Sequence, residues 1–212
     1  PLQLGRPDYT RWLLHEPNRA PPYRWHRRFL QHLQSEHMAD RWLLKSPAHL
    51  WSLPALLAEY PDAVVIQNHR DPLKVIASVS ALGASLREMT TDSFDVRTLA
   101  AQYGEDIMIG LDRALEARAA GIFAPGQVID VRYQDFRVDL IAMVGHIYDE
   151  LGIELTADAE SRMRAFLDAH PGDSEGSLKR YSFADTGLDE GEMRERARAY
   201  QEHFDVESEI IR

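Results

Sequence analysis

The feature of this sequence that most constrains its fold is a short pattern that occurs twice. Residues 42–47 read Trp-Leu-Leu-Lys-Ser-Pro, and residues 63–72 read Ala-Val-Val-Ile-Gln-Asn-His-Arg-Asp-Pro. In both, an apolar run leads to a basic residue, then to a residue that favours the helix N-cap, and then to a proline that favours the first helical turn. Each copy therefore predicts a strand that ends where a helix begins.

The rest of the chain continues this alternation. A third β-branched run at 128–131 follows a Pro-Gly turn and predicts a third strand after those at 42–44 and 63–66. Apolar residues at helical spacing predict helices at about 23–34, 96–119, 157–169 and 190–204, and one after 47 that Pro54 interrupts. Alternating strands and helices are typical of an α/β fold with a parallel sheet flanked by helices.

We expect one domain over residues 1–212. Residues 1–22 contain five prolines, which predict an irregular lead-in. Residues 170–188 are polar and contain glycine, which predicts a loop or flap.

Composition narrows the possible ligands. The chain has no cysteine, which excludes disulfides, thiolate metal sites and a cysteine nucleophile. Its net charge of −10 argues against nucleic-acid binding, and no apolar run approaches the roughly 18 residues of a membrane span. Residues 1–50, however, contain eight basic and four acidic residues, which favours a small anionic ligand. From charge alone, a solvated arginine-rich helix explains the same excess.

The two basic residues of the repeated pattern, Lys45 and Arg70, are the first candidate binding residues. Ligands of open parallel sheets bind at the carboxyl ends of strands, where helix N-termini also favour phosphate or sulfate. We therefore predict that Lys45 and Arg70 end neighbouring strands and face one cleft. Ser78 lies on the same helix face as Lys74, and both lean toward Arg70. The alternative is that both cations extend into solvent at the sheet edge and that Ser78 is a helix residue without a binding role.

His49 is a candidate general base because it falls in the first turn after Lys45. A half-buried histidine with a backbone partner is the alternative. No set of residues has metal-ligand spacing, so we expect no metal. The sequence also contains no Gly-x4-Gly-Lys-Ser/Thr loop, no Gly-x-Gly-x-x-Gly after a strand, and no Gly-x-Ser-x-Gly elbow.

Residues 42–50 and 69–78 together resemble bacterial members of the sulfotransferase family. Those enzymes move the sulfuryl group of 3′-phosphoadenosine 5′-phosphosulfate (PAPS) to an acceptor, usually a hydroxyl. The family binds the 3′-phosphate with an arginine that ends a strand and a serine eight residues later, and Arg70 and Ser78 match both residue types and the spacing. The resemblance implies a sulfotransferase fold similar to that of P-loop nucleoside triphosphate hydrolases.

Two further segments match the family more weakly. Tyr133-Gln134-Asp135 resembles its Tyr-Glu-Asp element, whose tyrosine lies near the adenine. Lys179-Arg180-Tyr181 falls where the family has a basic loop that reaches the 3′-phosphate. Lys45 and His49 resemble a lysine–histidine pair that the family has after the preceding strand, although the two residues are closer together in cytosolic sulfotransferases. The family's 5′-phosphosulfate loop has no counterpart here, so we expect a fold that is incomplete at its N-terminus, which also explains why only three strands are found.

The resemblance implies a division of roles. His49 is expected to accept the proton of the acceptor hydroxyl, and Lys45 to stabilise charge on the leaving oxygen. Arg70, Ser78, Tyr133, Lys179 and Arg180 are expected to bind PAPS, the only co-substrate. A small-molecule, glycan or lipid hydroxyl is the expected acceptor, and the cytoplasm the expected location.

Two alternatives remain from the residues themselves. One is a phosphoryl transferase (kinase) of similar architecture, which needs a magnesium-binding carboxylate such as Asp71. The other is a nucleotide-binding remnant without catalysis, which the absent phosphate loop favours.

Overall fold

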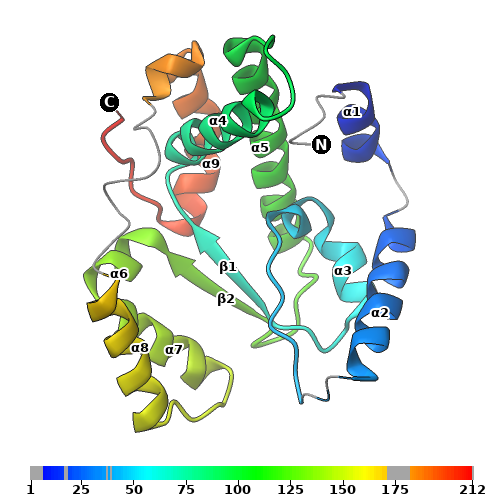
Figure 1. The fold of residues 1–212 in the computed structure, drawn as a ribbon, viewed down its shortest axis with the longest axis vertical. Helices are drawn as coiled ribbons and strands as arrows, with labels where there is room; N and C mark the ends of the chain where they lie inside the picture. The colour runs from blue at the N-terminus through cyan, green and yellow to red at the C-terminus, as the bar shows by residue number, and fades with distance from the viewer. Residues whose placement is uncertain (1–6, 17–18, 37, 39, 171–181, 212) are drawn as a thin grey trace.

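A two-stranded parallel sheet lies at the centre of the computed structural model, which describes residues 7–16, 19–36, 38, 40–170 and 182–211. Strand β1 (Val65–His69) pairs with β2 (Val128–Arg132) in a register that places His69 beside Arg132. Both strands run in the same direction, so their carboxyl ends meet at one edge (Figure 1). The prediction of an α/β fold with a parallel sheet flanked by helices is confirmed.

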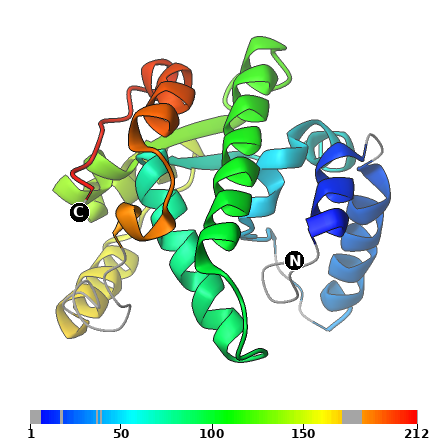
Figure 2. The same cartoon turned by 90° about the horizontal axis from the view of Figure 1, so that it is seen from above.

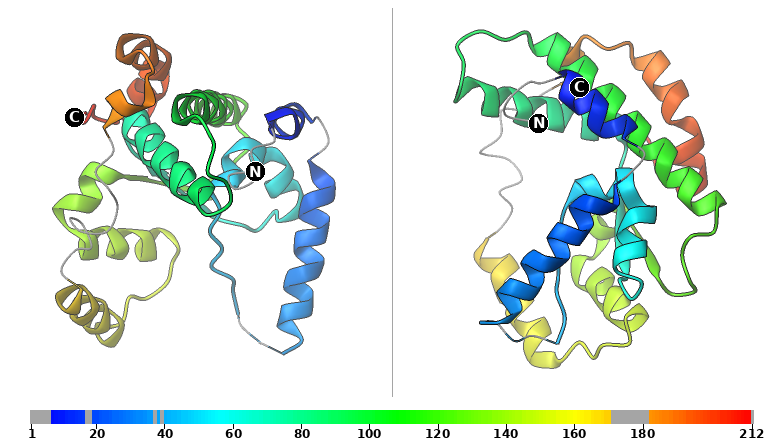
Figure 3. Two further views of the ribbon diagram at one scale, coloured as in Figure 1. Left: turned by 45° about the horizontal axis from the view of Figure 1, so that its top comes forward. Right: turned by 90° about the vertical axis from the view of Figure 1, so that its right-hand side faces the viewer.

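Helices lie around this sheet in three groups (Figures 1 to 3). The first contains α4 (Pro72–Glu88), α5 (Val96–Ala119) and α9 (Glu190–Phe204), with the short η2 (Phe183–Thr186). The second contains α2 (Ala20–Gln34), η1 (Pro47–Ser52) and α3 (Leu53–Glu59), with α1 (Pro7–His15) nearby, and the third contains α6 (Tyr133–Val138), α7 (Leu140–Glu150) and α8 (Ala157–Ala169). Within the described residues, no helix is long and apolar enough to cross a membrane.

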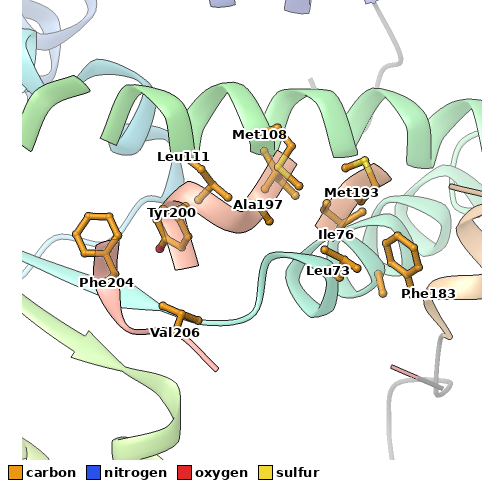
Figure 4. Close-up of a cluster of buried hydrophobic side chains, with 12 residues drawn as sticks. Leu73, Ile76, Met108, Leu111, Phe183, Met193, Ala197, Tyr200, Phe204 and Val206 are labelled. Carbon is orange, nitrogen blue, oxygen red and sulfur yellow. The ribbon is translucent and has the colours of Figure 1, made fainter. Parts of the chain in front are cut away.

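The main hydrophobic core lies between α4, α5 and α9 (Figure 4). Leu73 and Ile76 of α4 are fully buried there against α5 and α9. Its labelled members are Leu73, Ile76, Met108, Leu111, Phe183, Met193, Ala197, Tyr200, Phe204 and Val206. Because α4 begins immediately after β1, this core fixes the position of the residues that follow the strand.

A buried histidine joins the sheet to α9. The Nε2 atom of His69 lies 2.8 Å from a carboxylate oxygen of Asp130, and its Nδ1 atom lies 2.7 Å from the hydroxyl of Tyr200. A carboxylate only accepts, so Nε2 of His69 donates its proton to Asp130. This arrangement links β1, β2 and α9 directly below the strand ends.

Glycine permits a close contact that positions η1 on α5. Gly110 faces the indole of Trp51, and a Cβ atom at this position would lie 2.9 Å from the ring. The indole Nε1 of Trp51 donates to the backbone carbonyl of Asp106 at 2.8 Å. Any side chain at position 110 would therefore displace the turn that carries His49.

Several element predictions are confirmed at their bounds. The helices predicted at 96–119, 157–169 and 190–204 are α5, α8 and α9. Pro54 interrupts the helix after residue 47 as expected, because η1 ends at Ser52 and α3 starts at Leu53.

Two predictions were wrong, and the bounds of a third were shifted. Residues 42–44 form no strand in the structure, and Leu43 is 91% exposed, because no described strand pairs with this segment. The strand predicted at 63–66 lies at 65–69. The lead-in predicted over 1–22 contains α1 and the start of α2, because Pro7, Pro21 and Pro22 occupy first turns of helices, where proline is favoured. Of the loop predicted at 170–188, residues 171–181 lie outside the described residues, and Phe183–Thr186 form η2.

Candidate functional site

The edge where β1 and β2 end brings two predicted binding residues into contact. Arg70 follows β1 directly, and Tyr133 begins α6 directly after β2. The guanidinium carbon of Arg70 lies 4.0 Å from the centroid of the Tyr133 ring, a cation–π contact. The parallel register explains this meeting, since it places the residues that follow the two strands side by side.

Arg70 also forms an ion pair that sequence reasoning missed. Its Nε atom donates to Oε1 of Glu209 at 2.7 Å, and its Nη2 atom donates to Oε2 at 3.0 Å. The hydrogen bond to Glu209 raises the pKa of Arg70 above its ordinary value. Glu209 lies in the segment after α9, so three distant parts of the chain meet at this guanidinium.

Asp71 caps α4 as predicted and has further partners. Its side chain accepts from the backbone N–H of Leu73 at 3.0 Å, from Nη1 of Arg194 at 2.7 Å and from the backbone N–H of Glu209 at 2.7 Å. Asp71 is 1% exposed. Its carboxylate therefore joins the start of α4 to α9 and to the following segment, and both of its oxygens accept hydrogen bonds.

Ser78 lies on an accessible face of α4. Its side chain is exposed, and Lys74, one turn earlier on the same face, is half-buried. Side chains on a helix lean toward its N-terminus, which is the end that adjoins Arg70. The described part of the chain offers the Ser78 hydroxyl no hydrogen-bond partner, so it is free to contact a ligand.

The other junction contains Lys45 and His49. Ser46 caps η1 by accepting from the backbone N–H of Ala48 at 3.3 Å, so the predicted cap is present although the turn is a 3₁₀ helix. Lys45 is exposed. His49 is half-buried, and its Nδ1 atom lies 3.0 Å from the hydroxyl of Tyr23 in α2.

The surroundings of His49 favour a neutral imidazole. Burial, and secondarily the nearby His26, lower the pKa of His49 below its ordinary value. Burial raises the pKa of Tyr23 to about 12, so Tyr23 is an uncharged phenol. With the proton on Nδ1, the imidazole donates to the Tyr23 oxygen, and Nε2 carries a lone pair that can accept a proton.

His26 has its own partner in the same region. Its Nδ1 atom lies 2.7 Å from the hydroxyl of Tyr60, and its ring meets that of His49 edge to face. Tyr23 and His26 are three residues apart, so they lie on one side of α2, the side that packs against η1. This spacing is the signal in the sequence that could have identified them as neighbours.

The prediction that Lys45 and Arg70 end neighbouring strands was wrong. The strand beside β1 is β2, and Lys45 lies on an exposed segment outside the sheet. One hollow, of about 470 Å³, lies away from both residues, between α7 and α8. Among the described residues no strand ends at Lys45, and a ligand site shared by Lys45 and Arg70 stays a prediction. Lys179 and Arg180 lie outside the described residues.

Comparisons with a family model and with solved structures point to the same family. The sequence matches the model of a family described as the sulfotransferase family over residues 6–158. The structure is similar to that of sulfotransferase STF9 from Mycobacterium avium, with a TM-score of 0.85 and 30% identity over 97% of this chain and 52% of that chain. It is also similar to sulfotransferase STF1 from Mycobacterium tuberculosis H37Rv, with a TM-score of 0.76 and 32% identity over 92% of this chain and 49% of that chain. No curated protein sequence matches, and the chain spans about half the length of these two solved structures.

Proposed function

Because this chain belongs to the sulfotransferase family, we propose that it moves the sulfuryl group of PAPS to an acceptor hydroxyl. The observation that carries the proposal is the position of Arg70, which lies at the shared end of two parallel strands against the ring of Tyr133. A guanidinium at a helix N-terminus suits a phosphate, and an aromatic ring beside it suits a nucleobase. The acceptor is the hydroxyl of a small molecule, a glycan or a lipid.

The residues present fit a 3′-phosphorylated nucleotide. Arg70 supplies a positive charge, Ser78 a hydroxyl with no partner among the described residues, and α4 an N-terminus two turns away from that hydroxyl. Tyr133 supplies the aromatic surface. We assign the 3′-phosphate to Arg70 and Ser78 and the adenine to the neighbourhood of Tyr133, with Lys179 and Arg180 as further phosphate ligands.

The chemical step uses the other junction. The acceptor oxygen forms a bond to sulfur while the bond between sulfur and the bridging oxygen breaks, and 3′-phosphoadenosine 5′-phosphate leaves. His49 accepts the acceptor's proton at Nε2, a role that its lowered pKa and its contact with Tyr23 support. Lys45 is exposed. In this proposal its ammonium stabilises the negative charge that develops on the bridging oxygen.

The kinase alternative is less well supported. It needs a carboxylate at a strand end that is available to Mg²⁺, and Asp71 was the candidate. The side chain of Asp71 accepts hydrogen bonds from Leu73, Arg194 and Glu209, so both carboxylate oxygens are already engaged.

Nucleotide binding tests the proposal. We expect 3′-phosphoadenosine 5′-phosphate to bind more tightly than AMP in calorimetry, and Arg70→Ala to remove that preference. A hydrogen bond to a charged group contributes about 1.5–3 kcal/mol, so the preference falls by roughly ten- to a hundredfold. Arg137→Ala is the matched control, because Arg137 is an exposed arginine on α6. Equal affinities for the two nucleotides with and without Arg70 contradict the proposal.

A further inference from the structure

The segment after α9 folds back over the start of α4 and is well fixed there. Val206 is buried, and the side-chain amide of Gln201 donates to its carbonyl at 3.1 Å and to Oγ of Ser208 at 3.2 Å. These contacts set the direction of the chain as it leaves the helix. Glu209 therefore reaches Arg70 from a defined backbone and not from a loose end.

The backbone of Glu209 is held on both sides. Its N–H donates to Oδ2 of Asp71 at 2.7 Å, and its carbonyl accepts from Nη2 of Arg194 at 3.2 Å. Arg194 also donates to the other oxygen of Asp71 at 2.7 Å. Because Asp71 is buried and caps α4, the Glu209 carboxylate cannot move far from Arg70 without breaking this arrangement.

The geometry of the pair leaves one edge of the guanidinium open. Glu209 accepts from Nε and Nη2, and the ring of Tyr133 covers one face of the guanidinium. A guanidinium is planar, so contacts at one edge and one face fix its orientation. The described part of the chain gives the Nη1 atom no partner, and the Arg70 side chain is 37% exposed. Nη1 is therefore available to an incoming anion.

We propose that Glu209 is a positioning residue that orients Arg70, so that Nη1 is directed at the 3′-phosphate of the nucleotide. The inference rests on the proposed function, in which Arg70 binds that phosphate. Glu209 stays in place when the ligand binds, because its backbone is fixed by Asp71 and Arg194. The carboxylate also lowers the net charge at Arg70, so binding depends on the direction of the guanidinium more than on its charge.

Three variants of the protein test this role. Glu209→Ala removes both hydrogen bonds, Glu209→Gln keeps one acceptor, and Glu207→Ala removes an equal charge from an exposed position in the same segment. The readout is the dissociation constant for 3′-phosphoadenosine 5′-phosphate and for AMP, with the melting temperature measured alongside. We expect Glu209→Ala to weaken the bisphosphate about tenfold, Glu209→Gln about threefold, and Glu207→Ala less than twofold. AMP affinity is expected to change less than twofold in all three.

A double variant separates positioning from a general structural effect. Because Glu209 acts through Arg70, Glu209→Ala is expected to add nothing to the loss that Arg70→Ala causes. The inference fails if Glu209→Ala binds the bisphosphate equally or more tightly, or if it weakens binding by the same factor in the Arg70→Ala background. If Glu209→Ala does not fold, Glu209→Gln decides the matter by the same comparisons. When Arg70→Ala itself leaves the preference for the bisphosphate intact, the proposed function fails, and this inference fails with it.

Discussion

The two junctions that share one sequence pattern differ sharply in structure. At Arg70 the preceding run is a paired strand, and the cap residue Asp71 is buried with three partners. At Lys45 the preceding run is an exposed segment outside the sheet, and the side chain of the cap residue Ser46 accepts from the backbone N–H of Ala48 in its own turn. The cap and the proline thus start a helical turn in both places, whereas a strand forms only where another strand pairs with it.

The largest expected effect comes from the buried cap. Asp71→Ala leaves the Nη1 atom of Arg194 and two backbone N–H groups without this acceptor, and we expect the free energy of unfolding to fall by about 3 kcal/mol. Chemical denaturation monitored by circular dichroism measures this change. A loss below about 1 kcal/mol, the size of an ordinary cap effect, would show that the two junctions are energetically alike.

The second largest effect is expected at the junction that contains Lys45 and His49, which is the less buried of the two. His49→Ala is expected to lower kcat at least about a hundredfold, equivalent to about 2.7 kcal/mol, because it removes the proposed general base. The melting temperature should stay nearly unchanged and nucleotide binding should survive, since Arg70 lies at the other junction. Steady-state kinetics and thermal unfolding test both parts.

Two controls sharpen that result. His26→Ala removes a neighbouring imidazole that contacts Tyr60, and kcat should change only a few-fold. The pH profile of kcat/KM provides the second control: a base must be unprotonated, and the pKa of His49 is lowered by burial and by His26, so activity should fall with decreasing pH only below the ordinary histidine range near 6.5. If kcat falls less than tenfold in His49→Ala, another residue is the base, and His26 and His32 are the next to test.

The smallest effect is expected at the exposed cap. Ser46→Ala removes one side-chain contact to the N–H of Ala48, and we expect a loss of about 1 kcal/mol or less. The same denaturation experiment as for Asp71→Ala gives the value. A loss equal to that of Asp71→Ala would mean that the start of η1 is as deeply integrated into the fold as the start of α4.

Sequence patterns predicted what depends on nearby residues. Apolar periodicity located α5, α8 and α9, and the resemblance to the sulfotransferase family singled out Arg70 and Tyr133, which the structure brings into contact. These features are encoded locally, or follow from the rule that parallel strands end at one edge.

What the sequence did not reveal depends on the path of the whole chain. Glu209 lies 139 positions from Arg70, and an acidic residue near a helix end has no local signature that names its distant partner. Tyr23 lies 26 positions from His49, and only the packing of α2 beside η1 brings them together. Whether residues 42–44 form a strand depends likewise on a pairing partner, and an apolar run does not specify that partner by itself.

The pairing of β1 with β2 has a consequence for the order of folding. Val65 pairs with Val128, and all of α4 and α5 lie between them in the sequence. Helices form in microseconds from local contacts, whereas a strand pair separated by a long loop must first overcome the entropy of closing that loop. We therefore expect α4 and α5 to associate early and the edge that carries Arg70 and Tyr133 to close late. In pulsed hydrogen exchange during refolding, the amides of α5 should be protected before those of β2.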